Sequence, residues 1–107
     1  MATLFLQSLR CLDQQEGGGD EIYLKFNDNG GAGSGKSAVF KGMDNGDFRS
    51  VSGAFSFSGC VKLTMMEEDG FLNPDDVIQA FNVSTPGNYT TNFSGDGATY
   101  QLKYFIA

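Results

Sequence analysis

The chain has 107 residues, enough for one hydrophobic core and too few for two domains. Apolar residues make up 40% of it, and the formal net charge is −6. The seven basic residues are scattered singly, so the sequence offers no basic run, and we expect no nucleic-acid binding. Histidine is absent, which removes the commonest general base near neutral pH and every histidine-activated nucleophile. These features favour a binding protein over an enzyme.

The start of the chain, Met-Ala-Thr-Leu-Phe-Leu, lacks the basic segment and the long apolar run of a signal peptide. No stretch approaches the roughly 18 apolar residues of a transmembrane helix. We therefore expect a cytoplasmic protein, or one exported without a conventional signal peptide. Cys11 and Cys60 lie in apolar alternating segments, which favours buried reduced thiols, although their spacing leaves a disulfide open.

Apolar and polar residues alternate along most of the chain, and turn residues separate the alternating segments. This pattern predicts a single all-β domain over residues 1–107, an eight-stranded antiparallel β-sandwich. The turn Gly95-Asp96-Gly97 predicts a hairpin between the last two strands. The expected strands are Thr3–Leu12, Glu21–Asn27, Ala38–Met43, Phe48–Phe57, Cys60–Met66, Val77–Val83, Asn88–Ser94 and Ala98–Ile106.

The segment Asp75–Phe81 allows two interpretations. Its alternation is that of a strand, but Asn73-Pro74 followed by two acids is also a good helix start, with an N-cap and a proline in the first turn. A strand and a helical turn both remain open here.

Residues Gly30 to Ser37 match the phosphate-binding P-loop pattern in every position. The chemistry of that motif needs a helix directly after the loop, whose N-terminus faces the phosphates. The following residues are soon interrupted by Asp44-Asn45-Gly46, which cannot sustain a helix of several turns. We therefore interpret the segment as a flexible glycine loop between strands.

Most of the acids fall into two predicted loops, which follow the first and the fifth expected strands. In an antiparallel sandwich, loops that follow two odd-numbered strands can leave at the same end, so the two groups of acids can face each other. Crowded carboxylates repel one another unless a hard cation neutralises them, and Ca²⁺ is bound by such oxygen ligands. A solvated acidic rim that binds nothing is the alternative. The acids concerned are Asp13, Glu16, Asp20, Glu21, Glu67, Glu68, Asp69, Asp75 and Asp76.

The same loops carry a family resemblance. Leu9–Leu12 followed by Glu16–Lys25 resembles the first calcium loop of C2 domains, and Glu67-Glu68-Asp69 followed by Asp75–Ile78 resembles the third. The sequence departs from the family pattern at Glu67, where the family has Asp, and at Gln79, where it has Gly. The resemblance implies a C2-like sandwich that holds Ca²⁺ between its loops. The implied ligands are Asp20, Asp69, Asp75 and Asp76, followed by Glu16, Glu67 and Asp13.

Phe71 and Leu72 lie between the two groups of acids in the later loop. They either pack inward or contact a partner surface, as such loop residues do in C2 domains that dock to membranes. We therefore expect a non-enzymatic calcium-binding module that docks to a membrane or glycan surface through its acidic loops. A lectin, haemagglutinin or adhesion protein is the alternative, and glycoside hydrolysis by a carboxylate pair such as Glu67 and Asp76 is a weaker third. A homo-oligomer would add avidity to any of the surface-binding functions.

Overall fold

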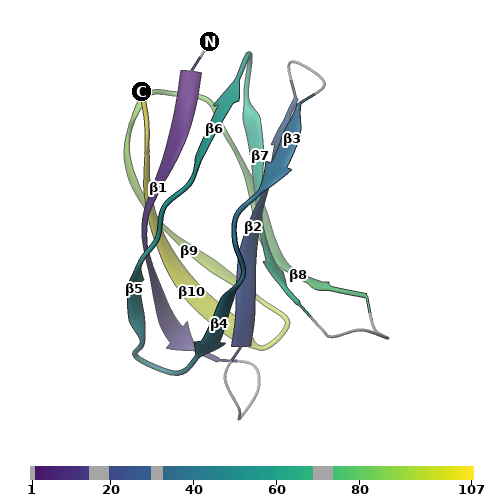
Figure 1. Ribbon diagram of the computed structural model, residues 1–107, viewed down its shortest axis with the longest axis vertical. Helices are drawn as coiled ribbons and strands as arrows, with labels where there is room; N and C mark the ends of the chain where they lie inside the picture. The colour runs from purple at the N-terminus through teal and green to yellow at the C-terminus, as the bar shows by residue number, and fades with distance from the viewer. Residues whose placement is uncertain (1, 15–19, 30–32, 69–73) are drawn as a thin grey trace.

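The computed structural model describes residues 2–14, 20–29, 33–68 and 74–107. Two antiparallel sheets face each other across one core (Figure 1). Sheet A has the order β5-β1-β10-β9, with β6 also paired to β1, and sheet B has the order β3-β2-β7-β8, with β4 also paired to β2. The strands are β1 Ala2–Asp13, β2 Asp20–Asp28, β3 Ser34–Lys36, β4 Phe40–Met43, β5 Phe48–Ser50, β6 Ala54–Phe57, β7 Val61–Glu67, β8 Asp76–Val83, β9 Gly87–Gly95 and β10 Ala98–Ile106.

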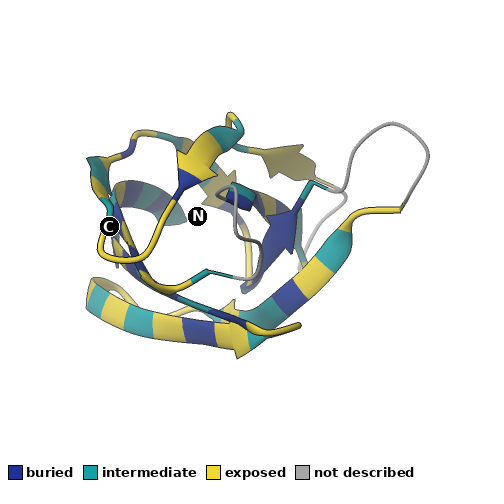
Figure 2. Cartoon of the chain, turned by 90° about the horizontal axis from the view of Figure 1, so that it is seen from below, coloured by how far each residue is buried: buried dark blue, intermediate teal, exposed yellow. Residues whose placement is uncertain are grey.

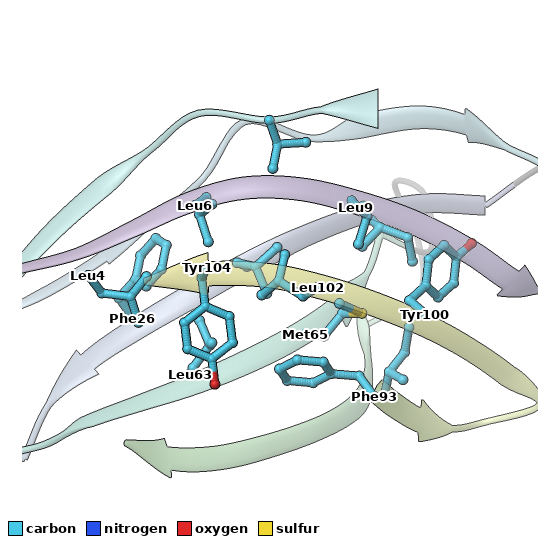
Figure 3. Close-up of a cluster of buried hydrophobic side chains, with 14 of the residues drawn as sticks. Leu4, Leu6, Leu9, Phe26, Leu63, Met65, Phe93, Tyr100, Leu102 and Tyr104 are labelled. Carbon is cyan, nitrogen blue, oxygen red and sulfur yellow. The ribbon is translucent and has the colours of Figure 1, made fainter. Parts of the chain in front are cut away.

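The core follows directly from the alternation of the strands. In β10, Tyr100, Leu102 and Tyr104 point inward and are at most 1% exposed, while the residues between them face outward. Opposite them, Leu63 and Met65 of β7 are fully buried, and these side chains fill the space between the two sheets (Figure 3). Seen from the end at which β4 meets β5, buried and exposed residues alternate along the strands (Figure 2).

The predicted all-β sandwich is confirmed, but it has ten strands rather than eight, because one expected strand is interrupted and one short strand, β3, was missed. The expected strand Phe48–Phe57 is divided into β5 and β6 around residues 51–53. There β1 has a bulge between Leu6 and Ser8, and the N–H groups of Leu6 and Val51 reach across it to the carbonyls of Gly53 and Gln7.

On the other edge, β3 and β4 both pair with β2 and are separated by residues 37–39. Ser37 bridges this gap. Its hydroxyl accepts a hydrogen bond from the Leu24 N–H at 2.9 Å, and its own N–H donates to the Leu24 carbonyl at 2.8 Å. A side chain therefore satisfies a backbone group that a continuous strand would have paired.

Two further expectations are resolved by the structure. The segment Asp75–Phe81 is not helical, since β8 pairs with β7 over Asp76–Val83. The segment Gly30–Ser37, which matches the P-loop pattern, is not a loop throughout, because its residues Ser34–Lys36 form β3 in pairing with β2, and no helix occurs among the described residues. Cys11 and Cys60 are both free thiols, the first buried and the second partly exposed.

Candidate functional site

The described acids of the two predicted loops lie at one end of the sandwich. Asp13 ends β1, Asp20 begins β2, Glu67 ends β7, and Asp76 begins β8. The register places Glu67 between Ile22 and Asp76, and the Glu68 N–H donates to the Glu21 carbonyl at 2.8 Å. The predicted convergence of the two loops is thus confirmed at the level of the backbone.

The side chain of Asp20 is buried and hydrogen-bonded within the protein. It is only 1% exposed, and it accepts a hydrogen bond from the Tyr100 hydroxyl at 2.6 Å, which ties the start of β2 to β10 of the opposite sheet. Burial, together with the hydrogen bond to Asp20, raises the pKa of Tyr100 above its usual value. Burial likewise raises the pKa of the neighbouring Cys11 thiol above its usual value.

The Asp75 side chain bonds a residue on the outer face of sheet B. Its carboxylate accepts a hydrogen bond from the Tyr23 hydroxyl at 2.5 Å. Tyr23 alternates with the inward-facing Ile22 and Leu24, so it lies on the outer face of sheet B. Burial, with the bonded Asp75 as the second cause, raises the pKa of Tyr23 to about 12.

The hydrogen bonds of Asp20 and Asp75 affect whether the predicted calcium site can form. Glu67 is 1% exposed, whereas Asp13 is exposed at the end of β1, and the parts of the chain that the structure describes contain no group of three acids able to hold a metal ion. Because Asp20 and Asp75 bond tyrosines on opposite sheets, the described carboxylates as arranged do not fit a calcium site. Glu16 and Asp69, together with the predicted contact residues Phe71 and Leu72, lie outside the described residues.

A third loop lies at this end, the turn between β4 and β5. The Gly46 N–H donates to the Cys11 carbonyl at 2.8 Å, and Asn45 accepts a hydrogen bond from the Gln14 N–H through Oδ1 at 2.6 Å. Asp47 closes the turn by accepting the Asp44 N–H at 3.0 Å. The residues Asp44-Asn45-Gly46 predict a turn, but only the tertiary structure shows that this turn contacts the end of β1.

Three large apolar side chains are exposed in the described parts of the chain, and all belong to this end. Leu12 is 44% exposed near the end of β1, Phe48 is 54% exposed at the start of β5, and Val77 is 56% exposed near the start of β8. The guanidinium of Arg10 lies 5.0 Å from the centre of the Phe48 ring. The loop end therefore combines acids with exposed apolar groups.

A second candidate site lies on the outer face of sheet B. Lys25 and Lys36 are direct partners in the register of β2 with β3, and Lys62 stands opposite Asn27 on β7. Alternation along β2 puts Lys25 and Asn27 on the face away from the core. An open hollow of about 360 Å³ is lined by Lys25, Asn27, Ser34, Gly35 and Lys36.

This basic face corrects the expectation that the basic residues form no cluster. They are separated in the sequence, but the pairing of β2 with β3 and β7 gathers three of the seven on one surface. The ammonium group of Lys36 also lies 5.9 Å from the centre of the Tyr23 ring, which holds it over the sheet. The alternation within Tyr23–Asn27 indicates which residues of β2 face outward, but the sequence does not show that β3, which carries Lys36, pairs with β2.

Comparison with known proteins bears on the fold. No family model matches the sequence, and no curated protein matches it. Among solved structures, one described simply as a C2 domain shares 19% identity with a TM-score of 0.63, over 99% of this chain and 96% of its own. The fold is C2-like.

Two larger proteins contain the same C2-like fold. CC2D1B, which coordinates ESCRT-III activity during the mitotic reformation of the nuclear envelope, gives a TM-score of 0.74 at 13% identity over 98% of this chain. Human GIVD cytosolic phospholipase A2 gives 0.62 at 14% identity, also over 98% of this chain. This chain spans 53% of the CC2D1B chain and 16% of the phospholipase chain, so it matches only a part of each.

Proposed function

We propose that this C2-like protein is a module that docks to anionic phospholipid membranes, with the outer face of sheet B as the surface that receives phosphate headgroups. The observation that carries the proposal is the hollow between Lys25 and Lys36. Two ammonium groups, with Asn27 and Ser34 as hydrogen-bond donors beside them, form a site whose chemistry suits a phosphate. The structural likeness to part of a phospholipase supports a lipid surface as the partner.

The net charge of −6 opposes binding to an anionic surface unless the charges are separated in space. Figure 1 places β3 toward one end of the molecule, and the end of β1 and the start of β2, where Asp13 and Asp20 lie, toward the other. The molecule is 40 Å long, and charges in water are screened beyond about 8 Å at physiological salt. Most of the loop acids are therefore screened from the basic face. Asp75 is the exception, because it bonds Tyr23, over whose ring the Lys36 ammonium lies. The basic face can still attract a membrane locally where Lys25 and Lys36 line the hollow.

In this proposal calcium is not required for docking. Oxygen donors gather at the loop end, but the described carboxylates do not form a metal site, so docking through the lysines does not depend on the ion. If Glu16 and Asp69 complete a site there, calcium would lower the negative charge of that end and let Leu12, Phe48 and Val77 approach the lipid. Calcium would then add to binding that already exists in its absence.

Vesicle sedimentation tests the proposal. Wild-type protein in chelator is expected to sediment with vesicles that contain phosphatidylserine and not with phosphatidylcholine alone. A basic residue near an anionic membrane contributes about 1 kcal/mol, so the double variant Lys25→Gln/Lys36→Gln should lose about 2 kcal/mol and bind roughly 30-fold more weakly.

Arg10→Gln/Lys103→Gln is the matched control for charge, because it also removes two positive charges and both residues are exposed on strands of the other sheet. Loss of binding in both variants would indicate a general charge effect. Unchanged binding of the Lys25→Gln/Lys36→Gln variant would refute docking through this face. Binding that appears only with calcium, and not with magnesium, would transfer the docking surface to the loop end.

A further inference from the structure

The edges of the two sheets differ in how they are protected. Sheet A ends on one side at β5 and β6 and on the other at β9, and sheet B ends at β3 and β4 and at β8. An exposed edge offers a row of backbone N–H and C=O groups to any other strand. Proteins commonly block such edges with short strands, charged residues or bulges.

Three of these edges have such protection. β3, β4, β5 and β6 are only three or four residues long, and Lys36, Lys41 and Arg49 lie on them. β8 begins at Asp76 beside Glu67, and a register shift between Met65 and Met66 interrupts its pairing with β7. A second strand would meet charge or irregular backbone at each of these edges.

β9 has none of these features. It extends over nine residues, Gly87–Gly95, and pairs with β10 in unbroken register from Gly87 opposite Ile106 to Gly95 opposite Ala98. No charged residue and no proline occurs within it. Tyr89 holds its first half in place by stacking on Tyr104 at 5.2 Å. No described strand pairs with its outer side.

The hairpin turn determines which amides point outward. Asp96 and Gly97 both have positive φ, 51° and 81°, as the two central residues of a type I′ turn do. Gly95 and Ala98 then form the hydrogen-bonded pair that closes the hairpin, so odd-numbered residues of β9 bond β10 and even-numbered residues face the edge. The Ser94 N–H already donates to Gln79 Oε1 at 2.8 Å. The backbone groups of Asn88, Thr90 and Asn92 are directed at the open edge.

We propose that β9 pairs antiparallel with β9 of a second copy of this chain, which joins the two A sheets into one. The edge-facing residues read Asn88, Thr90, Asn92, a pattern that is symmetric about Thr90. A two-fold axis at Thr90 sets the two Thr90 residues opposite each other and each Asn88 opposite Asn92 of the second copy. Threonine pairs of this kind stabilise antiparallel strands.

Charge favours a second copy at this edge over the other edges. Two molecules of charge −6 repel each other wherever their acids meet, but residues 83–95 carry no charge at all. Lys103 is the register partner of Thr90, so the two Lys103 residues would be separated by three strand spacings, about 14 Å. That distance exceeds the screening length of about 8 Å at physiological salt, so their repulsion is weak.

The test is the oligomeric state of protein made in a bacterium. Asn88-Tyr89-Thr90 and Asn92-Phe93-Ser94 match the N-glycosylation sequence pattern, and they stay unmodified in that host. Sedimentation velocity over a concentration series is expected to show a species with twice the chain mass of 11.5 kDa. Thr90→Lys places two like charges on the two-fold axis and should leave a monomer where the wild type is dimeric. Gln7→Lys adds the same charge to an exposed position of β1 and should leave the dimer intact.

Amide hydrogen exchange identifies the surface. The amides of Tyr89, Thr91 and Phe93 bond β10 and should be protected at every concentration, whereas those of Asn88, Thr90 and Asn92 should gain protection only where the dimer forms. A monomer at all concentrations would overturn the inference. So would a dimer in which these three amides exchange freely, because such a dimer uses another surface.

Discussion

The hydrogen bond between Tyr100 and Asp20 links the two sheets through side chains that are almost fully buried. Removing its donor with Tyr100→Phe leaves a carboxylate in the core without that bond. A hydrogen bond to a charged group contributes about 1.5–3 kcal/mol, and we expect a loss of that size in the free energy of unfolding, measured in urea.

Tyr104→Phe is the matched control for this substitution. The Tyr104 hydroxyl lies 3.3 Å from the neutral Thr91 hydroxyl, a longer contact with a weaker partner. Its loss should cost about 1 kcal/mol. Equal costs for the two variants would contradict the assignment of Asp20 as a structural acid.

Tyr23 predicts how stability responds to alkaline pH. In the unfolded chain its phenol loses the proton near the ordinary pKa of 10.0, but in the folded protein only near a pKa of about 12. Between these values the unfolded state binds fewer protons, so the free energy of unfolding falls as pH rises. Tyr23→Phe removes this contribution and should make the fall shallower above pH about 10, with no change of slope below it. An unchanged alkaline slope would show that Tyr23 does not keep its proton in the fold.

At the residue scale, the sequence predicted that the acids of the two loops come together, but not which side chains they bond. Asp20 was predicted as a metal ligand from loop position and family resemblance. Its hydrogen-bond donor Tyr100 is 80 residues away, and only the packing of β2 against β10 brings them together. Asp75 was likewise predicted as a metal ligand, and its hydrogen-bond donor Tyr23 is 52 residues away. The binding of calcium by these residues stays a prediction.

At the element scale, β8 and β9 approach each other most closely at Gly95. A Cβ atom at Gly95 would lie 2.0 Å from the Ile78 carbonyl oxygen, a backbone atom that cannot move aside alone. Gly95→Ala should therefore push the two strands apart and cost about 1–3 kcal/mol of stability. Faster exchange of the Ser94 amide, which donates to Gln79, should accompany the loss.

Gly35→Ala is the control, since its Cβ would meet the Phe55 ring at 3.5 Å and the Phe26 ring at 4.0 Å, which are ordinary contacts. That variant should be neutral or slightly more stable, because alanine has less freedom in the unfolded chain. If Gly95→Ala were equally harmless, the close approach of β8 and β9 would be wrong.

The period-two alternation was sufficient to predict the two-layer sandwich, its long strands and the Asp96-Gly97 hairpin. It was not sufficient to predict the interruptions. The bulge in β1 that divides β5 from β6, and the Ser37 hydroxyl that separates β3 from β4, are contacts between strands remote in sequence. Short edge strands such as Ser34–Lys36 have too few residues to show any periodicity.

At the scale of the whole molecule, charge is divided between two regions that the sequence could not separate. Single lysines at positions 25, 36 and 62 appear isolated until strand pairing gathers them on sheet B. The acids, in contrast, are already clustered along the chain, which is why the sequence directed attention to the loop end alone. The expected surface-binding module thus acquires a second candidate surface, and the proposed docking belongs to that surface.

The most direct test of docking through sheet B is an NMR titration of the isotope-labelled protein with soluble short-chain phosphatidylserine in the presence of chelator. The account predicts that the largest amide shift changes occur at the residues around the hollow, Lys25, Asn27, Ser34, Gly35 and Lys36. Shift changes confined to the loop end, around Asp13, Asp20 and Glu67, or no saturable change anywhere, would contradict it.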